Sequence, residues 1–397
     1  MATNIVDVVN SIAELVERIK FSLNSVIVHR VNRSLDEYVE VSGRSSVLED
    51  NPIRVQDNIG YGYKGVLGFL DSSSRGIGFN PMRFIVSGLA FNISGSIGFI
   101  PSITGEARTG FIGVKSIRQI LEFIEENNPG FLVVKNIVGE YYDLEYKDDN
   151  IGDELRLNLE NNGLQRIIEN SNVDGVVIDG PLYYTPRILF YEGSIHGRYA
   201  EVFKKLFKYR IDMINKSYFP IIGFVKRVEY SRKLVRCNEL LSLLGLRGEH
   251  ASSTITDPLL VEYIVEAMVK PPLMKPVILG PFLLRYTGKH GDLEHVLRDK
   301  VYWYIARKTP RGYQIARIEV LYDHWRKWSS EIESISNTLV SSLSLRGIPA
   351  GLEIVDKASR RLTALLYMLM YQRLSPIISL AYDEYAKITD VLRELKE

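Results

Sequence analysis

Two aspartates that follow apolar segments are the residues of this sequence best placed to do chemistry. Asp71 comes after the apolar run 66–70, and Asp179 comes directly after the run 176–178. Short runs of valine, isoleucine, leucine and phenylalanine near glycines predict buried strands. A carboxylate at the end of such a strand needs a partner, because an unpaired charge beside the core is costly. Taken alone, Asp71 is also typical of a residue that caps a turn or a helix.

A third acid joins this pair in a predicted helix over residues 152–170. Glu160 lies between Leu157 and Leu164 on the apolar side of that helix. Glu154 lies about two turns earlier on the same face and competes with it, but Glu160 has apolar neighbours on both sides. Neighbouring carboxylates repel each other unless a cation lies between them, and oxygen ligands suit Mg²⁺ or Mn²⁺. Two such ions can clamp both oxygens of a phosphoryl displacement.

Other chemistries have little support. The single cysteine, Cys237, excludes an intramolecular disulfide and a cysteine-rich zinc site, and it fits a reducing cytosol. The six histidines show no HExxH spacing, and no Ser-His-Asp arrangement is evident. The GYGYKG sequence at 60–65 has dinucleotide-motif spacing, but it precedes a strand instead of joining a strand to a helix.

Charge is unevenly distributed along a chain that is nearly neutral overall, with 49 Lys and Arg against 48 Asp and Glu. Acids gather over residues 140–160, and Lys and Arg gather over residues 198–236. The basic block could attract phosphates, although two solvated helix faces would have the same composition. Lys226 and Arg227 follow the apolar strand 221–225, where they could hold a phosphate or simply start a helix.

The hydrophobic pattern predicts an α/β core with helical additions, because strands come first and helices follow with some alternation. Residues 72–81 are expected to form a loop. Strands are expected over 83–94, 131–142, 220–226, 276–286, 301–306 and 313–321. Helices are expected over 4–25, 116–127, 199–217, 227–244, 257–268, 329–346 and 349–374. No apolar run is long enough to span a bilayer and no signal peptide is evident, so we expect a soluble, cytoplasmic protein.

A set of ordered motifs resembles the NurA nucleases of thermophilic archaea. The motifs are FLDSSS, a helix with Glu160, VVIDGPLYY, GFVKR, YWYIARKTPRGYQIARIEV and GIPAGLEIVDKASRRL, and they follow one another from about residue 64 to about residue 365. The resemblance implies an RNase H-like mixed-sheet core and a homodimer that encloses a DNA channel. It also implies a manganese-dependent nuclease that resects 5′ ends and cuts single strands. The implied partner is a HerA-type hexameric ATPase that acts in double-strand-break repair by homologous recombination.

The resemblance assigns roles to individual residues. Asp71, Glu160 and Asp179 match the family's catalytic acids and would bind Mn²⁺ or Mg²⁺. Asp356 stands where the family often has a histidine, and it could complete the catalytic set. An aspartate can ligate a metal, but it donates no proton at neutral pH without a raised pKa. Arg317 and Glu319 match an R-x-E strand, which we interpret as a structural pair. The expected contacts to the DNA backbone are Lys226, Arg227, Arg232 and Lys233.

These patterns predict a helical arm over residues 1–60 and a nuclease domain over 61–397. The domain would include a helical insertion at about 229–275 and C-terminal helices over about 329–397. Two other functions stay open. A nucleotide-dependent phosphotransferase of related core would need glycine-rich phosphate loops, and none is convincing here. A non-catalytic adaptor of a DNA-translocating ATPase would fit the departure at Asp356, but unused buried acids cost stability.

Overall fold

A single mixed sheet of twelve strands organises the molecule. Its strand order is β1-β10-β11-β12-β9-β8-β3-β4-β6-β7, with β2 paired to β10 and β5 paired to β4. The computed structural model describes residues 43–48, 53–55, 62–79, 82–102, 110–126, 132–170, 172–183, 195–229, 231–243, 255–286, 298–374 and 384–396. The helix expected over residues 4–25 lies outside these ranges.

The strands are β1 (Gly43–Val47), β2 (Ile53–Val55), β3 (Leu67–Phe79), β4 (Met82–Ile93), β5 (Ser96–Ile100), β6 (Ile112–Lys115), β7 (Leu132–Val133), β8 (Gly175–Asp179), β9 (Ile221–Val225), β10 (Pro276–Tyr286), β11 (Lys300–Thr309) and β12 (Gly312–Leu321). The helices are α3 (Arg118–Glu126), α4 (Asp148–Asn170), α5 (Ile195–Lys216), α6 (Asn238–Leu243), α8 (Asp257–Ile264), α9 (Tyr322–Ser341), α10 (Ala350–Leu374) and α11 (Glu384–Lys396), with a 3₁₀ helix at Leu234–Arg236 and a π-helical turn at Val265–Val269. None of these helices combines the length and the apolar character that crossing a membrane requires.

The centre of the sheet brings two of the predicted strands together. Strands β3, β4 and β6 are antiparallel neighbours, whereas β8 pairs with β3 in parallel and β9 pairs with β8 in parallel. In the β3–β8 register, Leu70 lies opposite Ile178. The next residue on each strand is an aspartate, so Asp71 and Asp179 lie at equivalent heights of adjacent strands.

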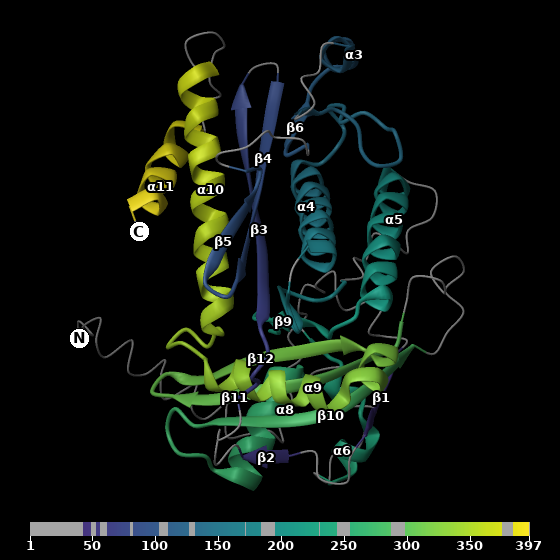
Figure 1. Cartoon of the computed structure of the whole chain (residues 1–397), viewed down its shortest axis with the longest axis vertical. Helices are drawn as coiled ribbons and strands as arrows, with labels where there is room; N and C mark the ends of the chain where they lie inside the picture. The colour runs from purple at the N-terminus through teal and green to yellow at the C-terminus, as the bar shows by residue number, and fades with distance from the viewer. Residues whose placement is uncertain are drawn as a thin grey trace, which may run out of the picture.

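Helices cover both sides of the β3–β4 hairpin. Figure 1 shows α10 on one side of β3 and β4, with α4 and α5 on the other. The start of α10 approaches β3 very closely, since a Cβ at Gly351 would come within 2.4 Å of the Phe69 ring. A Cβ there would push the Phe69 ring away, so the glycine permits a close packing that brings the following turns of α10 against Asp71.

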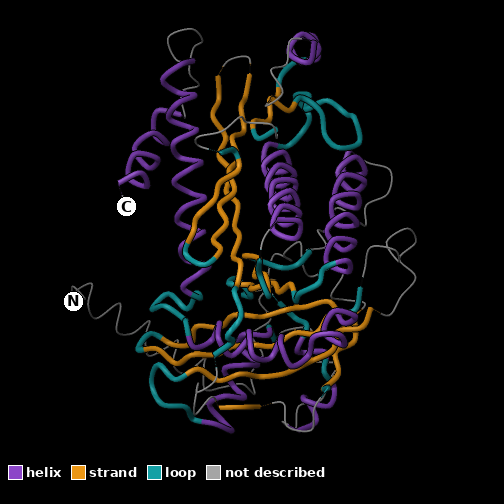
Figure 2. The backbone as a smooth tube through the Cα atoms, in the orientation of Figure 1, coloured by secondary structure: helices purple, strands orange, loops and turns teal. Residues whose placement is uncertain are grey.

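The strands β10, β11 and β12 form the other half of the sheet, as the orange tubes in the lower part of Figure 2 show. Tyr302, Tyr304 and Phe282 are buried there against Leu260 and Val261 of α8. The strands β1 and β2 lie within the segment assigned to an N-terminal helical arm, yet they pair with β10 and extend the sheet.

The loop expected over residues 72–81 is wrong. Strand β3 continues through the three serines to Phe79, because β4 pairs with it residue by residue from Gly68↔Ile93 to Phe79↔Met82. The strand expected over residues 131–142 shrinks to Leu132–Val133. Asp71 is thus an interior residue of a long strand, and pairing with β4 holds the backbone both before and after it.

The helix expected over residues 227–244 is also wrong. A loop leads instead into the 3₁₀ helix at Leu234–Arg236 and then into α6. The cause is Asp257, which is fully buried and accepts hydrogen bonds from the backbone N–H groups of Lys233, Leu234 and Val235. These bonds satisfy the donors in a turn and so replace the expected helix.

Candidate metal centre

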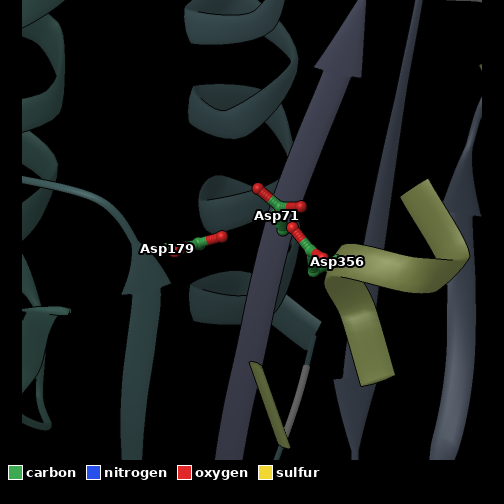
Figure 3. A group of neighbouring side chains, drawn as sticks. All are labelled: Asp71, Asp179 and Asp356. Carbon is green, nitrogen blue, oxygen red and sulfur yellow. The ribbon is translucent and has the colours of Figure 1, made fainter. Parts of the chain in front are cut away.

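Three aspartates from distant parts of the chain meet beside β3. Asp71 comes from β3, Asp179 from the end of β8 and Asp356 from the second turn of α10. Each offers a carboxylate oxygen, and these oxygens lie within 4.8 Å of one another. Figure 3 shows the carboxylates converging from their three elements. We call these residues the three-aspartate group.

Burial and mutual repulsion set the electrostatics of this group. Burial raises the pKa of Asp71 well above its ordinary value, and the nearby charge of Asp179 raises it further. A hydrogen bond of 2.9 Å from Ser359 Oγ to Asp71 Oδ2 acts in the opposite direction. Burial also raises the pKa of Asp179, although Lys226 opposes this shift. The group therefore carries a charge repulsion that a cation would relieve.

Lys226 supplies one cation to the group. Its Nζ lies 2.5 Å from Asp179 Oδ2 and 3.2 Å from Asp356 Oδ1. Burial alone would lower the pKa of Lys226, but the charges of Asp179 and Asp356 outweigh burial and raise it. We expected this lysine to face a phosphate. Its ammonium lies between two carboxylates instead.

One oxygen of the group is left without a partner. Asp179 Oδ1 is buried and has no hydrogen-bond partner within the part of the chain that the structure describes. A buried carboxylate oxygen without a donor costs free energy unless something else satisfies it. Carboxylate oxygens at this spacing are the ligands that Mg²⁺ and Mn²⁺ prefer. The three-aspartate group therefore fits a hard divalent cation.

Glu160 lines the same cleft but lies outside the three-aspartate group. Its carboxylate pairs with Arg210 Nη2 at 2.7 Å and accepts a 2.5 Å hydrogen bond from Ser72 Oγ. Arg210 comes from α5 and is only 2% exposed, so this ion pair is buried. The sequence placed Arg210 in the basic block over residues 198–236, where nothing distinguished it from solvated lysines.

Glu154, the competing acid of the same helix, does not line the cleft. It is buried and accepts hydrogen bonds from the hydroxyls of Tyr142 and Tyr146. Burial raises its pKa to about 7, although the two tyrosines act in the opposite direction. Glu154 therefore belongs to the packing between α4 and the segment before it.

The three-aspartate group lies in a cleft of about 490 Å³ that also contains many cations. Of the four expected DNA contacts, Lys226, Arg227 and Lys233 line this cleft, whereas Arg232 is not among its lining residues. This arrangement suits a phosphodiester bound next to a metal ion, because the acids can hold the ion and the neighbouring cations can bind the phosphate.

The sequence profile of the NurA domain matches residues 39–361. The chain belongs to the NurA family.

The search of curated proteins gave no match. Among solved structures, the NurA nuclease from Sulfolobus solfataricus is 12% identical and aligns over 94% of this chain and 98% of its own, with a TM-score of 0.44. A NurA structure with manganese is 8% identical over 92% and 98%, with a TM-score of 0.45. Human ENDOV is 11% identical over 83% and 94%, with a TM-score of 0.28.

The R-x-E pair of the NurA resemblance lies deep in the wall of the cleft. Glu319 is fully buried and lies 2.9 Å from Lys300 Nζ and 3.4 Å from Arg317 Nη2. Burial would raise the pKa of Glu319, but Lys300 and Arg317 outweigh it and lower the pKa to about 2. Glu319 also accepts a 2.8 Å hydrogen bond from the backbone N–H of Leu182. This bond fixes the turn that follows Asp179.

Proposed function

We propose that this NurA-family protein is a metal-dependent deoxyribonuclease that hydrolyses phosphodiester bonds at the three-aspartate group. The observation that carries the proposal is the meeting of Asp71, Asp179 and Asp356 with carboxylate oxygens within 4.8 Å of one another. The unpartnered Oδ1 of Asp179 supports it, because that oxygen is an available ligand. Family membership supports a nucleic-acid substrate.

The sheet topology supports an RNase H-like core. The central strands follow the order β6-β4-β3-β8-β9, in which the first three are antiparallel and the last three are parallel. In this order β3 lies directly beside β8, and the two strands run parallel. Asp71 and Asp179 therefore reach the same point from β3 and β8.

The proposed ligands are Asp71, Asp179 and Asp356, with Glu160 as a further candidate. Bound there, Mn²⁺ or Mg²⁺ would activate the attacking water and stabilise the leaving oxygen of the phosphodiester. Glu160 could take part only by giving up its pair with Arg210 and its hydrogen bond from Ser72. We therefore propose Asp71, Asp179 and Asp356 as the principal metal ligands.

Other residues of the chain hold and orient this set. Ser359 donates to Asp71 Oδ2 and fixes the orientation of that carboxylate. Lys226 keeps Asp179 and Asp356 together, since its ammonium pairs with both. Arg227 and Lys233 lie along the same cleft, where they can meet backbone phosphates. Contacts to phosphates carry no sequence information, so we expect cleavage with little sequence preference.

The finer part of the proposal comes from the family. We infer a 5′–3′ exonuclease and single-strand endonuclease activity, manganese as the preferred ion and a homodimer as the working unit. We also infer that the protein processes the ends of double-strand breaks together with a HerA-type hexameric ATPase. The proposed location is the cytoplasm.

End-labelled DNA tests the proposal. Single- and double-stranded oligonucleotides would be incubated with the protein in Mn²⁺, in Mg²⁺ or in EDTA, with and without a HerA-type partner. The proposal predicts cleavage with a divalent ion and none in EDTA. Cleavage that is equally fast in EDTA would exclude metal catalysis, and an intact substrate under every condition would favour the adaptor. Stabilisation by ATP without cleavage would favour the phosphotransferase.

A further inference from the structure

Arg75 is a cation of the cleft to which the proposed mechanism gives no part. It lies four residues after Asp71 on β3, so strand alternation puts both side chains on the same face. Its guanidinium forms an ion pair with Glu394 of α11, and both residues line the cleft. Arg75 Nε is buried and has no hydrogen-bond partner within the described residues. The guanidinium therefore has a donor left for a further acceptor.

The helix α11 does not depend on Glu394 for its attachment. Val391 is 1% exposed and belongs to the core, and Glu384 is equally buried. Tyr367 Oη of α10 donates a 3.0 Å hydrogen bond to Glu384 Oε2. Figure 1 shows α11 lying beside α10. Because these contacts hold the earlier turns of α11, its last turn can carry Glu394 to the cleft without being needed for docking.

Glu394 also lies beyond the residues that the NurA domain profile matches. The match to the NurA domain ends at residue 361, whereas α11 spans Glu384–Lys396. The ion pair thus joins a residue of the core strand to a helix outside the matched region.

Arginine binds carboxylates and phosphates in the same planar, two-pronged geometry. We propose that the Glu394 carboxylate binds Arg75 at the position where a backbone phosphate of single-stranded DNA would otherwise bind. The helix α11 would thus form an autoinhibitory contact. The incoming phosphate must displace a carboxylate that the protein itself supplies. Glu394 also adds negative charge to a cleft that already holds the three-aspartate group, and this charge opposes the entry of DNA. The inference rests on the proposed function, because it takes DNA as the ligand.

Equilibrium binding of a fluorescein-labelled single-stranded oligodeoxynucleotide to the full-length protein in EDTA tests the contact without cleavage. Glu394→Gln should tighten binding about fivefold, since Arg75 becomes available. The slope of log K against log salt should steepen by about 0.7, the value for one more phosphate contact on a single strand. Arg75→Met should weaken binding and should remove the effect of Glu394→Gln in the double variant.

Asp390→Asn is the matched control, because it removes one charge from the same helix four residues earlier. It should change binding less than twofold. Unchanged binding by Glu394→Gln, or equal tightening in the Arg75→Met background, would overturn the inference. Equal tightening by Asp390→Asn would do the same. A wild-type protein that cleaves DNA while Glu394→Gln binds like wild type refutes only the autoinhibition. Tightening by Glu394→Gln in a protein that never cleaves DNA supports the contact and refutes the nuclease.

Discussion

The ammonium of Lys226 lies 2.5 Å from Asp179 Oδ2, which places a cation of the chain inside the candidate metal centre. The same ammonium pairs with Asp356, whereas Asp179 Oδ1 has no hydrogen-bond partner in the described residues. The lysine thus neutralises part of the charge that would otherwise attract a metal ion. It both holds the acids together and competes with the ion that they are arranged to bind.

Replacing Lys226 by methionine should therefore strengthen Mn²⁺ binding while it weakens the metal-free protein. We expect affinity to rise about tenfold, which corresponds to roughly 1.4 kcal/mol, because the ion no longer competes with an ammonium. In EDTA the variant should unfold at lower temperature, since Asp179 and Asp356 lose their partner. Calorimetric titration with Mn²⁺ and thermal unfolding give the two readings.

The control for that experiment is Arg227→Met, which removes an exposed positive charge next to Lys226. It should leave Mn²⁺ affinity unchanged. If Lys226→Met binds Mn²⁺ no better than this control, the lysine is no competitor of the ion.

Loss of Asp356 should mainly weaken Mn²⁺ binding, whereas loss of Glu160 should mainly lower the stability of the fold. Asp356→Asn removes an oxygen of the three-aspartate group and should weaken Mn²⁺ binding at least tenfold with little loss of stability. Glu160→Gln should change Mn²⁺ affinity less but should lower stability by about 3 kcal/mol, because Arg210 is left buried without its carboxylate. Calorimetry and urea unfolding separate the two effects. A larger loss of affinity in Glu160→Gln would make Glu160 a principal ligand.

The acids of the site could largely be read from the sequence, since apolar runs that end in aspartate mark Asp71 and Asp179. Asp356 follows only from the resemblance to the family motif, in which it stands where a histidine is common. The pairing of Glu160 with Arg210 could not, because it depends on how α4 and α5 pack. The length of β3 was also hidden, since serines and glycines have weak strand preference and only pairing with β4 extends the strand.

The loop after β9 shows another limit of sequence reasoning. The basic residues over 227–244 have the composition of a helix, but Asp257 binds the backbone N–H groups of Lys233, Leu234 and Val235. A contact between residues more than twenty positions apart overrides the local preference. The position of Lys226 was hidden for the same reason, because Asp356 comes from α10.

Glu154 should make stability depend on pH. Its pKa in the folded protein is raised from 4.5 to about 7. A raised carboxyl pKa contributes stability that is present below 4.5 and is lost as the pH rises through 7. Glu154→Gln removes this titration. Wild type should therefore lose up to about 3 kcal/mol of unfolding free energy between pH 4 and pH 9 that the Glu154→Gln variant does not lose. The difference between variant and wild type should shift in favour of the variant by that amount.

Urea unfolding at several pH values measures that difference. Glu169→Gln, on the exposed side of the same helix, is a suitable comparison. A constant difference between Glu154→Gln and wild type across this range would show that Glu154 is ionised with an ordinary pKa.

Cleavage of end-labelled DNA in Mn²⁺ by wild type, Asp71→Asn and Asp179→Asn tests the central claim most directly. Both variants keep the size of the side chain and remove one buried acidic group. Asp71→Asn should therefore fold at least as well as wild type in EDTA. Asp179→Asn gives up the ion pair with Lys226, but it should stay folded because Lys226 keeps its pair with Asp356. Both should lose at least a thousandfold in cleavage rate and should bind Mn²⁺ more weakly in calorimetry. Cleavage at the wild-type rate by either folded variant would contradict the account.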